Sequence, residues 1–338
     1  MMNIDSIQIE KGAVLAPMAG ITNLPHRLLA KAAGASLVYS EMISANGLVR
    51  NSQKTIRLLE SHPDEKPLSA QMFGTDPLVM AEAAAMMEAL GADIVDINFG
   101  CAVKKIVKTG AGVALMKHPD QTEKILKSVR EAIRVPLTIK IRSGWDFTGN
   151  QALEIARIAE FCGVNAIAVH PRTASQAFRG KADWTVISKV KQSVSIPVIG
   201  NGDINSWQDA VRMTHETECD AVMIGRAAIG NPFLFTQASA ALKGENPPEN
   251  NLLNRLGQAR EYLRRSVEFL GEKTAMYIMR SRLGWFVKGL PHNGHFRESI
   301  KHLNTESDAL ALIDSYQKDV EQFFGEKNVT SELLISSN

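Results

Sequence analysis

The sequence predicts a (β/α)8 barrel followed by a separate helical domain. Eight short β-rich runs alternate with longer stretches of helical patterning. The runs are continuously apolar, which is typical of parallel strands covered on both faces. Glycine-rich sequence follows the last two runs, where such barrels commonly bind phosphate. An open, doubly wound sheet is the alternative, and the count of eight together with the glycine-rich endings favours the closed barrel.

The expected elements follow in chain order. Strands are predicted at residues 13–18, 36–41, 67–73, 93–98, 136–142, 165–170, 196–201 and 219–225. Helices between them are predicted at residues 76–90, 119–133, 150–162 and 206–215. Pro77 and Pro119 stand where a first helical turn tolerates proline, and glycines follow several of the helices as caps.

The 338 residues suffice for a barrel and an appended domain. Residues 1–243 are assigned to the barrel, and the polar stretch 244–251, with two prolines, reads as a linker. Residues 251–324 show helical patterning without a convincing strand and form the predicted helical domain. The polar residues 325–338 are expected to be a flexible tail.

Bulk properties indicate a cytoplasmic protein. None of the three cysteines forms a C-x-x-C pair, so neither a disulfide framework nor a zinc site is predicted. The N-terminus lacks the apolar region of a secretory signal, and no apolar run reaches the roughly 18 residues of a membrane span. We expect no metal, no membrane association and no obligate protein partner.

The active site of a barrel lies at the carboxyl ends of its strands. Cys101 follows the fourth predicted strand in a glycine-containing loop, whereas Cys162 and Cys219 read as buried fillers. Nearby lysines would favour a thiolate. A thiol that donates a proton must instead stay protonated, and both possibilities remain open for Cys101.

Other strand ends carry polar side chains. Gln71 suits the edge of a pyrimidine-like ring, or is a hydrogen-bonded structural residue. Lys140 and Arg142 share one face of their strand, as a site for an anionic ring or phosphate or as rim salt bridges. A histidine and an arginine, His170 and Arg172, likewise face one way.

The phosphate-binding prediction rests on the last two strands together. Glycine N–H groups, a helix start and an arginine would hold a phosphate there. The residues are Asn201, Gly202, Asp203, Gly225 and Arg226. Neither a P-loop nor a G-x-G-x-x-G sequence after a strand is present, so nothing indicates ATP use or a Rossmann domain.

Taken together, the motifs A-P-M-A-G, Q-M-F-G, D-I-N-F-G-C, I-K-I-R-S-G, V-H-P-R-T, V-I-G-N-G-D-I and M-I-G-R-A-A-I-G-N-P resemble the tRNA-dihydrouridine synthases. They occur in order from about residue 14 to residue 235. The segment R-S-R-L-G-W-F-V-K-G-L resembles the helical domain of the bacterial B-type branch.

The resemblance implies FMN as prosthetic group and NADPH or NADH as reductant. Reduced flavin would pass a hydride to C6 of a uracil in tRNA, and Cys101 would donate the proton to C5. The implied flavin contacts are Pro17, Met18, Ala19, Gln71, Lys140, His170, Asn201, Gly202, Asp203, Gly225 and Arg226. Asn98 and Arg142 match positions that meet the uracil, and Arg172 is also expected on the substrate side. Ala102 departs from the family, which usually has proline after the cysteine, and should loosen the loop.

Basic charge in the helical domain is segregated. Residues 255–301 hold ten Lys or Arg and four acidic residues, whereas residues 303–325 hold one Lys and five acidic residues. Arg280, Arg282 and Lys288, close to Trp285, are therefore predicted to bind tRNA, the alternative being a solvated helix face. Two other functions stay open: a barrel flavoenzyme acting on a free pyrimidine or another small unsaturated molecule, and a non-catalytic RNA-binding protein.

Overall fold

The computed structural model describes the backbone of residues 1–145 and 147–335, and the side chains of the same ranges as far as Phe324. The chain folds into two compact units. One comprises Met1–Ala227 with Leu234–Pro248, and the other comprises Ala228–Phe233 with the chain from Glu249 onward. The short segment Ala228–Phe233, which the sequence analysis places in the barrel, thus groups with the helical unit.

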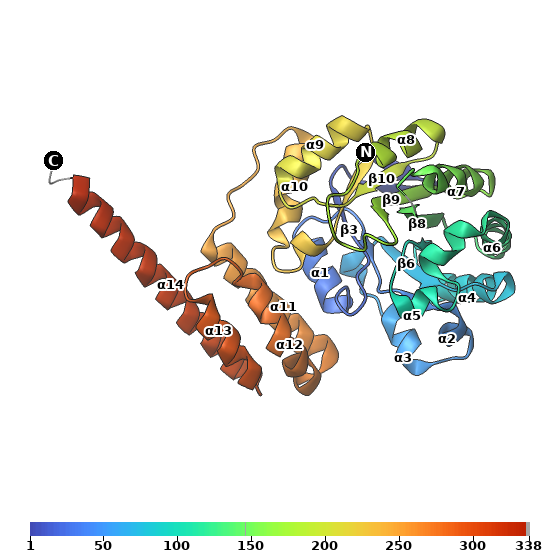
Figure 1. The fold of residues 1–338 in the computed structure, drawn as a ribbon. Helices are drawn as coiled ribbons and strands as arrows, with labels where there is room; N and C mark the ends of the chain where they lie inside the picture. The colour runs from blue at the N-terminus through green and yellow to red at the C-terminus, as the bar shows by residue number, and fades with distance from the viewer. Residues whose placement is uncertain (146, 336–338) are drawn as a thin grey trace. The chain divides into compact units, whose positions relative to one another are not determined.

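The first unit is a parallel barrel wrapped by helices (Figure 1). Neighbouring strands follow the order β3, β11, β10, β9, β8, β7, β6, β4, and β5 also pairs with β6. Backbone hydrogen bonds from Leu15 N to Leu37 O (2.9 Å) and from Ser36 N to Ala13 O (2.9 Å) connect the two ends of this order. The predicted (β/α)8 barrel is therefore confirmed.

All eight predicted strands occur. Their bounds are β3 (Ala13–Leu15), β4 (Val38–Tyr39) with β5 (Ile43–Ser44), β6 (Leu68–Phe73), β7 (Ile94–Phe99), β8 (Leu137–Gly144), β9 (Ala166–Thr173), β10 (Val198–Asn201) and β11 (Ala221–Ile224). Almost every residue of these strands is buried, because the interior is filled by side chains and the exterior is covered by helices.

An N-terminal hairpin was not predicted from the sequence. Strands β1 (Met2–Ile4) and β2 (Ile7–Ile9) pair antiparallel, and Ile4 and Ile9 join a cluster of buried apolar side chains from β3, β7, β9, β10 and β11. Strands of only three residues carry little periodicity, which explains why the pattern was missed.

Helices surround the barrel and begin where the sequence signals them. They are α1 (Leu24–Ala32), α2 (Ala45–Val49), α3 (Gln53–Ile56), α4 (Pro77–Ala89), α5 (Lys104–Val107), α6 (Pro119–Ala132), α7 (Asn150–Phe161), α8 (Thr185–Ser193), α9 (Trp207–Thr217) and α10 (Phe233–Lys243). The side chain of Asp76 accepts hydrogen bonds from Leu78 N and Val79 N at the start of α4, which satisfies two of the otherwise unpaired first-turn N–H groups. Short 3-10 helices are η1 (Arg57–Leu59), η2 (Pro63–Glu65), η3 (Gly112–Lys117) and η4 (Arg226–Ala228).

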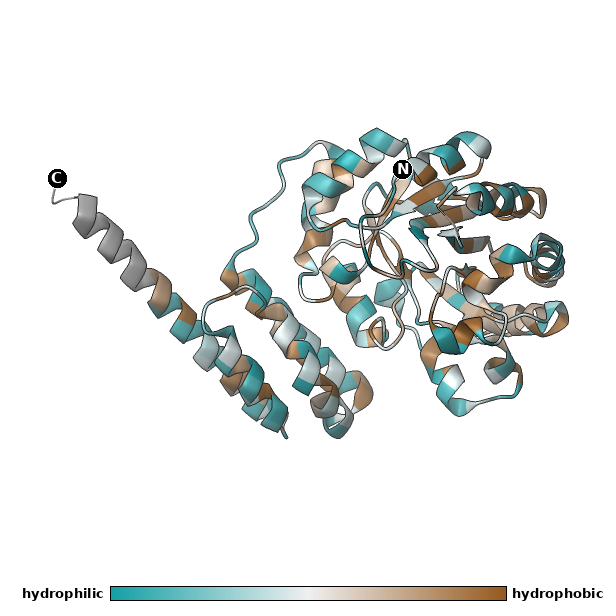
Figure 2. Ribbon diagram, viewed as in Figure 1, coloured by the Kyte–Doolittle hydropathy of each residue, from teal (hydrophilic) through white to brown (hydrophobic). Residues whose placement is uncertain are grey.

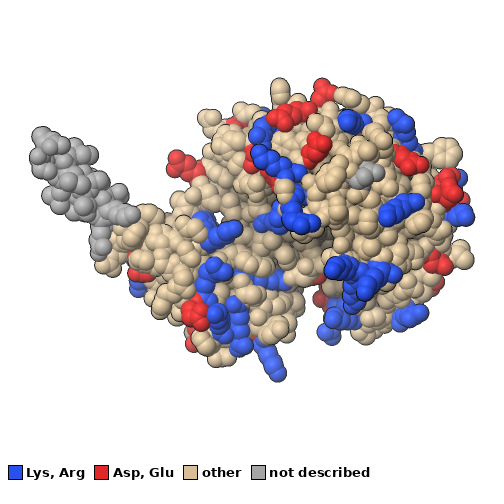
Figure 3. Space-filling model, in the orientation of Figure 1, with Lys and Arg blue, Asp and Glu red and all other residues tan. Residues whose placement is uncertain are grey.

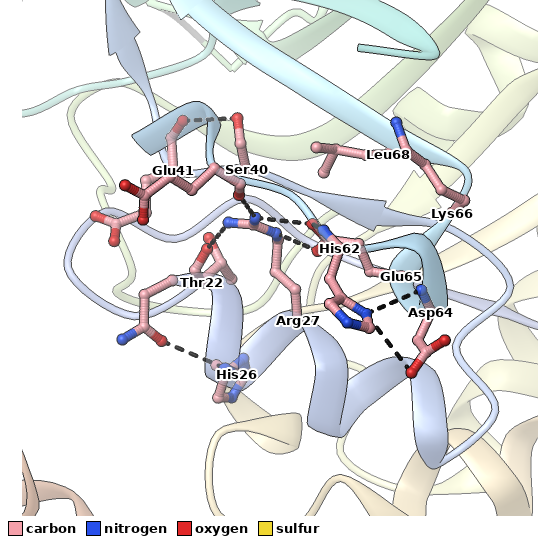
Figure 4. Close-up of polar contacts among 12 residues, drawn as sticks. Thr22, His26, Arg27, Ser40, Glu41, His62, Asp64, Glu65, Lys66 and Leu68 are labelled. Atoms are coloured by element: carbon pink, nitrogen blue, oxygen red, sulfur yellow. Dashed lines mark hydrogen bonds and ion pairs between the residues drawn. The ribbon is translucent and has the colours of Figure 1, made fainter. Parts of the chain in front are cut away.

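A buried ion pair fixes the first helix against the loop that precedes β6 (Figure 4). Arg27 Nε lies 2.6 Å from Glu65 Oε2, and both side chains are almost fully covered. Arg27 Nη1 also donates to the carbonyl of Thr22 at 3.0 Å, and its Nη2 donates to that of Glu60. Breaking such a pair by removing one partner costs about 3–5 kcal/mol, because the other charge stays buried.

The second unit is helical. Its elements are α11 (Leu252–Leu270), α12 (Glu272–Phe286), α13 (Asn293–Ser299), η5 (Ile300–His302) and α14 (Glu306–Ile335). The stretch between α10 and α11 is hydrophilic along its length (Figure 2). The backbone of α14 is helical as far as Ile335. The predicted flexible tail begins within this helix, and the side chains of residues 325–338 lie outside the described residues.

No helix in the described ranges combines the length and the apolar character needed to cross a bilayer. Within those same ranges, no group of three or more His, Cys, Asp or Glu side chains is arranged to hold a metal ion.

Candidate active site

The site lies at the carboxyl ends of the barrel strands, as the architecture dictates. The structure gathers there the side chains predicted from β6, β7, β8, β9 and β10 and the segments that follow β3 and β11.

A row of buried polar side chains crosses β6, β7 and β8. Gln71 and Asp96 are register partners on β6 and β7, and Thr138 is the partner of Asp96 on β8. Asp96 Oδ2 accepts from Gln71 Nε2 at 2.7 Å, and its Oδ1 accepts from Thr138 Oγ1 at 2.6 Å. The predicted residues Gln71 and Asn98 are brought together by a 2.9 Å bond from Asn98 Nδ2 to Gln71 Oε1.

Asp96 is a site residue that the sequence analysis missed. A signal existed, because Asp96 stands two positions before Asn98 in an otherwise apolar strand and shares its face. Burial is the main cause that raises the pKa of Asp96 to about 6, and its hydrogen bonds with Thr138 and Gln71 oppose that rise.

Cys101 follows β7 in a backbone held from both sides. Its N–H donates to Asn98 Oδ1 at 2.8 Å, and its carbonyl accepts from Val113 N at 3.1 Å. A Cβ on Gly112, which has φ +63°, would lie 2.6 Å from the Cys101 carbonyl oxygen, so only glycine fits there. These contacts hold the residue directly before Ala102, the position where the family usually has proline.

The Cys101 thiol favours its protonated form. Burial raises the pKa of Cys101, and the nearby Val103 backbone and the Arg142 charge only partly offset the rise. Desolvation of the charged form thus outweighs the attraction of neighbouring cations. A thiol in this state carries the proton that a general acid needs.

Lys140 is half-buried among the polar strand ends. Nζ donates to Asn201 Oδ1 at 2.9 Å, and Asn201 Nδ2 donates to Met223 O at 2.7 Å. Burial lowers the pKa of Lys140 to about 7, helped by the Arg142 charge and opposed by Asp96. The amino group therefore has its pKa close to neutral pH.

Arg142 joins the Cys101 loop to the loop after β9. Its Nε donates to Gly100 O at 2.7 Å, and its Nη1 donates to Thr173 O at 3.2 Å and Ala177 O at 2.9 Å. The guanidinium also lies 5.7 Å from the ring centre of Phe178. Phe178 is 58 % exposed and stacks beside His170 with ring centres 6.4 Å apart.

His170 and Arg172 face the same way along β9, as their spacing predicts. Arg172 Nη1 lies 3.3 Å from His170 Nε2, and its Nη2 donates to both carboxylate oxygens of Asp203 at 2.7 Å. Burial and the surrounding Lys and Arg charges lower the pKa of His170 well below its ordinary value, so the imidazole is neutral. Arg172 is 2 % exposed and is committed to Asp203 and to the carbonyls of the loop after β9.

The ends of β10 and β11 form a cradle suited to a phosphate-bearing group. Gly202 has φ +120°, and a Cβ there would lie 2.9 Å from His170 Cδ2. A Cβ on Gly225 would lie 3.6 Å from Ala16 Cβ and 3.8 Å from Met18 Sδ, which are ordinary contact distances. Arg226 is exposed, with its guanidinium 3.8 Å from Asp203 Oδ1 and 4.8 Å from the ring centre of Phe178. Open glycine backbone with an exposed guanidinium fits a phosphate.

Hydrogen bonds with Thr22 and Glu41 hold the segment that follows β3. Met18 N donates to Thr22 Oγ1 at 3.1 Å, and Thr22 Oγ1 donates to Met18 O at 3.2 Å. Gly20 N donates to Glu41 Oε2 at 2.5 Å. Pro17 and Met18 are half-buried and Ala19 is exposed, so this segment presents small or apolar groups to the site.

The predicted tRNA-binding residues of the helical unit differ in exposure. Arg280 is exposed, although its Nε donates to Leu303 O at 3.0 Å and its Nη2 to Asn304 Oδ1 at 3.0 Å. Lys288 is exposed after α12. Arg282 is only 8 % exposed, donates to the hydroxyl of Tyr262 and lies 5.7 Å from the ring centre of Trp285.

Comparison with known proteins identifies the family to which this barrel belongs. The model of the dihydrouridine synthase (Dus) family matches residues 14–322. The chain belongs to the dihydrouridine synthase family. It is an enzyme of that family, and the predicted relationship to the B-type branch is confirmed by the relatives below.

Three relatives illustrate the similarity. The chain is 39 % identical over 316 residues to the tRNA-dihydrouridine synthase B of Xanthomonas axonopodis, which covers 93 % of this chain and 95 % of the relative. It is 39 % identical over 316 residues to the tRNA-dihydrouridine synthase B of Pseudomonas aeruginosa, covering 93 % of each. It is 38 % identical over 316 residues to a probable tRNA-dihydrouridine synthase of Rickettsia bellii, covering 93 % and 96 %.

A solved structure shares the dihydrouridine synthase barrel fold. The 2-naphthoyl-CoA reductase complex with 2-naphthoyl-CoA superposes with a TM-score of 0.55 at 14 % identity, covering 72 % of this chain and 52 % of that one. The likeness bears on the fold alone.

Proposed function

We propose that this dihydrouridine synthase uses FMN, reduced by NADPH or NADH, to convert specific uridines of tRNA into 5,6-dihydrouridine. The observation that carries the proposal is the position of Cys101 directly after β7, where Asn98 Oδ1 accepts from its backbone N–H close to the polar ends of the barrel strands. The relatives named as tRNA-dihydrouridine synthases support the substrate.

The residues of the cradle fit FMN. Gly202 stands where a side chain would clash with His170, which leaves its backbone open to a ligand, and exposed Arg226 supplies positive charge for the phosphate. Pro17, Met18 and Ala19 would lie under the flat ring of the flavin. Asn201, Asp203 and His170 would lie between the ring and the phosphate. When bound and reduced, the flavin supplies a hydride to C6 of the uracil.

Gln71 and Lys140 are assigned to the ring edge. The half-buried Lys140 ammonium would stabilise negative charge that develops on the reduced ring, and its partial removal from water strengthens that interaction. Asn201 holds this amino group in place through its 2.9 Å hydrogen bond.

Cys101 completes the reaction as the general acid. Its S–H bond breaks as the proton passes to C5, and the electron pair stays on sulfur as a thiolate. The positive charge of Arg142 lowers the energy of that thiolate, and solvent returns the proton afterwards. Hydride at C6 and proton at C5 together account for the two hydrogens added across the double bond.

Asn98 and Arg142 are assigned to the uracil. Asn98 Nδ2 carries two hydrogens, of which one is donated to Gln71, so the second is available for a uracil carbonyl. The target base must leave its stack to reach the barrel mouth. Phe178, an exposed ring beside two guanidinium groups, marks the side from which the base enters.

The tRNA is assigned to exposed basic side chains. Blue side chains of Lys and Arg gather over α11 and α12 of the helical unit (Figure 3). Arg280 and Lys288 are proposed phosphate contacts, whereas Arg282 supports the surface through Tyr262 and Trp285. Lys104, Lys105 and Lys108, all exposed just after Cys101, add a second basic group on the barrel.

Position-resolved dihydrouridine mapping of tRNA from cells that lack this protein tests the proposal. We expect one or more uridines to lose the modification, and restoration by the wild-type gene but not by Cys101→Ala. An unchanged dihydrouridine map would contradict the proposed function, and would favour a reductase for a free pyrimidine or a non-catalytic RNA-binding role.

A further inference from the structure

The buried side chains of Thr138, Asp96, Gln71 and Asn98 form one continuous chain of hydrogen bonds that ends at the backbone of Cys101. Thr138 and Gln71 donate to the two carboxylate oxygens of Asp96, and Asn98 donates to Gln71. Asn98 Oδ1 then accepts from the N–H groups of Gly100 (3.1 Å) and Cys101 (2.8 Å). Asp96 and the Cys101 loop are thus linked through two carboxamides.

Burial makes this arrangement demanding. Asp96 and Gln71 are fully buried, Thr138 is 1 % exposed and Asn98 is 7 % exposed. The hydrogen bonds to Asp96 come from an amide and a hydroxyl, neither of which carries a charge. A buried carboxylate whose hydrogen bonds all come from neutral donors stabilises a fold poorly. The presence of Asp96 at this position is better explained by a contribution to the geometry of the site.

Asp96 determines which group donates and which accepts at each step of this chain of hydrogen bonds. A carboxylate only accepts hydrogen bonds, so Gln71 must turn its NH2 group toward Asp96 and its carbonyl oxygen toward Asn98. Asn98 must then turn its own NH2 group toward Gln71, which leaves Oδ1 facing the Cys101 loop. The loop offers two N–H groups, which require an acceptor, and the two ends of the chain therefore agree.

We propose, on the basis of the function proposed above, that Asp96 is a positioning residue that sets the orientation of Gln71 and Asn98 and thereby holds Cys101 in its working place. Asp96 is itself fully buried. It acts through the two carboxamides, one of which is assigned to the flavin edge and the other to the uracil.

Replacement of the carboxylate by an amide removes the constraint. In Asp96→Asn the new side chain can turn either its oxygen or its NH2 group toward Gln71. In the reversed arrangement Asn98 points its NH2 group at the N–H groups of Gly100 and Cys101, where donor faces donor and the loop is released. The volume of the side chain is nearly unchanged, so the substitution tests direction rather than packing.

The matched control is Asp93→Asn. Asp93 stands three residues earlier, where its Oδ2 accepts from Leu68 N at 2.7 Å and lies 2.9 Å from Lys66 Nζ, at the opposite end of the strand. Asp93→Asn therefore makes the same chemical change close by in the sequence, but outside the chain of hydrogen bonds that reaches Cys101.

The experiment compares flavin-loaded wild type, Asp96→Asn and Asp93→Asn in two measurements. The first is hydrogen–deuterium exchange of the peptide that contains Gly100 and Cys101. The second is the single-turnover rate of dihydrouridine formation after the flavin has been reduced. For Asp96→Asn we expect exchange to rise and the rate to fall, each by about tenfold or more, since a misplacement of about 1 Å can cost about a hundredfold in rate. Asp93→Asn should match wild type in both.

Wild-type exchange at this peptide together with a wild-type single-turnover rate in Asp96→Asn would overturn the positioning role. If Asp96→Asn does not fold, Thr138→Val replaces it. Loss of the Thr138 hydroxyl removes a hydrogen bond that favours the ionised form of Asp96, and a protonated carboxyl can, like an amide, turn a donor toward Gln71. Both readouts should then shift in the same direction by a smaller factor. Wild-type values of both readouts in a folded Thr138→Val would then overturn the proposal. The exchange measurement needs no turnover, so a failure of the proposed function is told apart from a failure of this inference.

Discussion

Lys140 donates a hydrogen bond from Nζ to Asn201 Oδ1 over 2.9 Å, which joins the ends of β8 and β10 across the intervening β9. Asn201 in turn is fixed by its own bond to Met223 O on β11. The position of the amino group is thus set by contacts that reach β10 and β11, and burial is the main cause that lowers the pKa of Lys140 to about 7.

Lys140→Met should change how stability depends on pH. Between pH 7 and 10 the unfolded chain binds a proton at Lys140, whose ordinary pKa is 10.5, that the flavin-free folded protein has lost. Raising the pH through this window therefore favours the folded wild type. Urea unfolding of flavin-free protein should show a free energy of unfolding that rises with pH in wild type relative to Lys140→Met. Lys189 is exposed, so Lys189→Met is the control and should follow wild type. Parallel curves for wild type and Lys140→Met would contradict the lowered pKa of Lys140.

The reactivity of Cys101 should reveal a raised pKa. Burial disfavours the thiolate, so iodoacetamide should label Cys101 in the folded protein more slowly at pH 7–9 than it labels a peptide of residues 98–106. The pH midpoint of labelling, followed by mass spectrometry, should lie above that of the peptide. A midpoint below the peptide's would mean that the cations dominate and that the thiol is ionised, against a proton-donor role.

Gly202→Ala should weaken flavin binding. The added Cβ would sit 2.9 Å from His170 Cδ2 on a backbone with φ +120°, so the cradle must deform. We expect an increase of about tenfold or more in the flavin dissociation constant, measured by fluorescence quenching, since about 1.4 kcal/mol corresponds to tenfold. Gly163→Ala is the control, because its φ is +79° but the nearest atom is 3.4 Å away. Equal affinities for Gly202→Ala and Gly163→Ala would place the phosphate elsewhere.

Lys288→Ala and Arg282→Ala should separate tRNA binding from packing. The exposed Lys288 is a phosphate contact in this account, so its loss should weaken tRNA binding and reduce the salt slope of binding by about one without changing thermal stability. Arg282, 8 % exposed and bonded to Tyr262, should instead lower the melting temperature of the helical unit when replaced. Filter-binding titrations at several salt concentrations and calorimetry provide the data. The reverse pattern would exchange the two roles.

The barrel could be predicted because its signals are local. Each strand is a short apolar run with its own boundaries, and residues such as Pro77 and Asp76 mark helix starts within a few positions of sequence. The β1–β2 hairpin was missed because three-residue strands carry too little pattern, and its apolar side chains are explained only by the barrel interior that they cover.

The sequence predicted where the site residues lie, but it predicted less well which partners they bond to. Strand-end placement brought Lys140, Arg142 and His170 into view, but burial and bonding partners depend on the whole fold. Arg282 and Arg280 are two positions apart and read alike in sequence, yet only the structure shows that Arg282 turns inward to Tyr262. Asp96 was passed over for the same reason, since its partners come from β6 and β8.

The most direct measurement uses purified enzyme, FMN, NADPH and an unmodified tRNA transcript, with nucleoside mass spectrometry as readout. Wild type should convert uridine into a product heavier by two hydrogens. Cys101→Ala should bind flavin and oxidise NADPH as wild type does, yet form dihydrouridine at least about a hundredfold more slowly, the lower end of what general acid catalysis contributes. Product formation at the wild-type rate by Cys101→Ala would contradict the account.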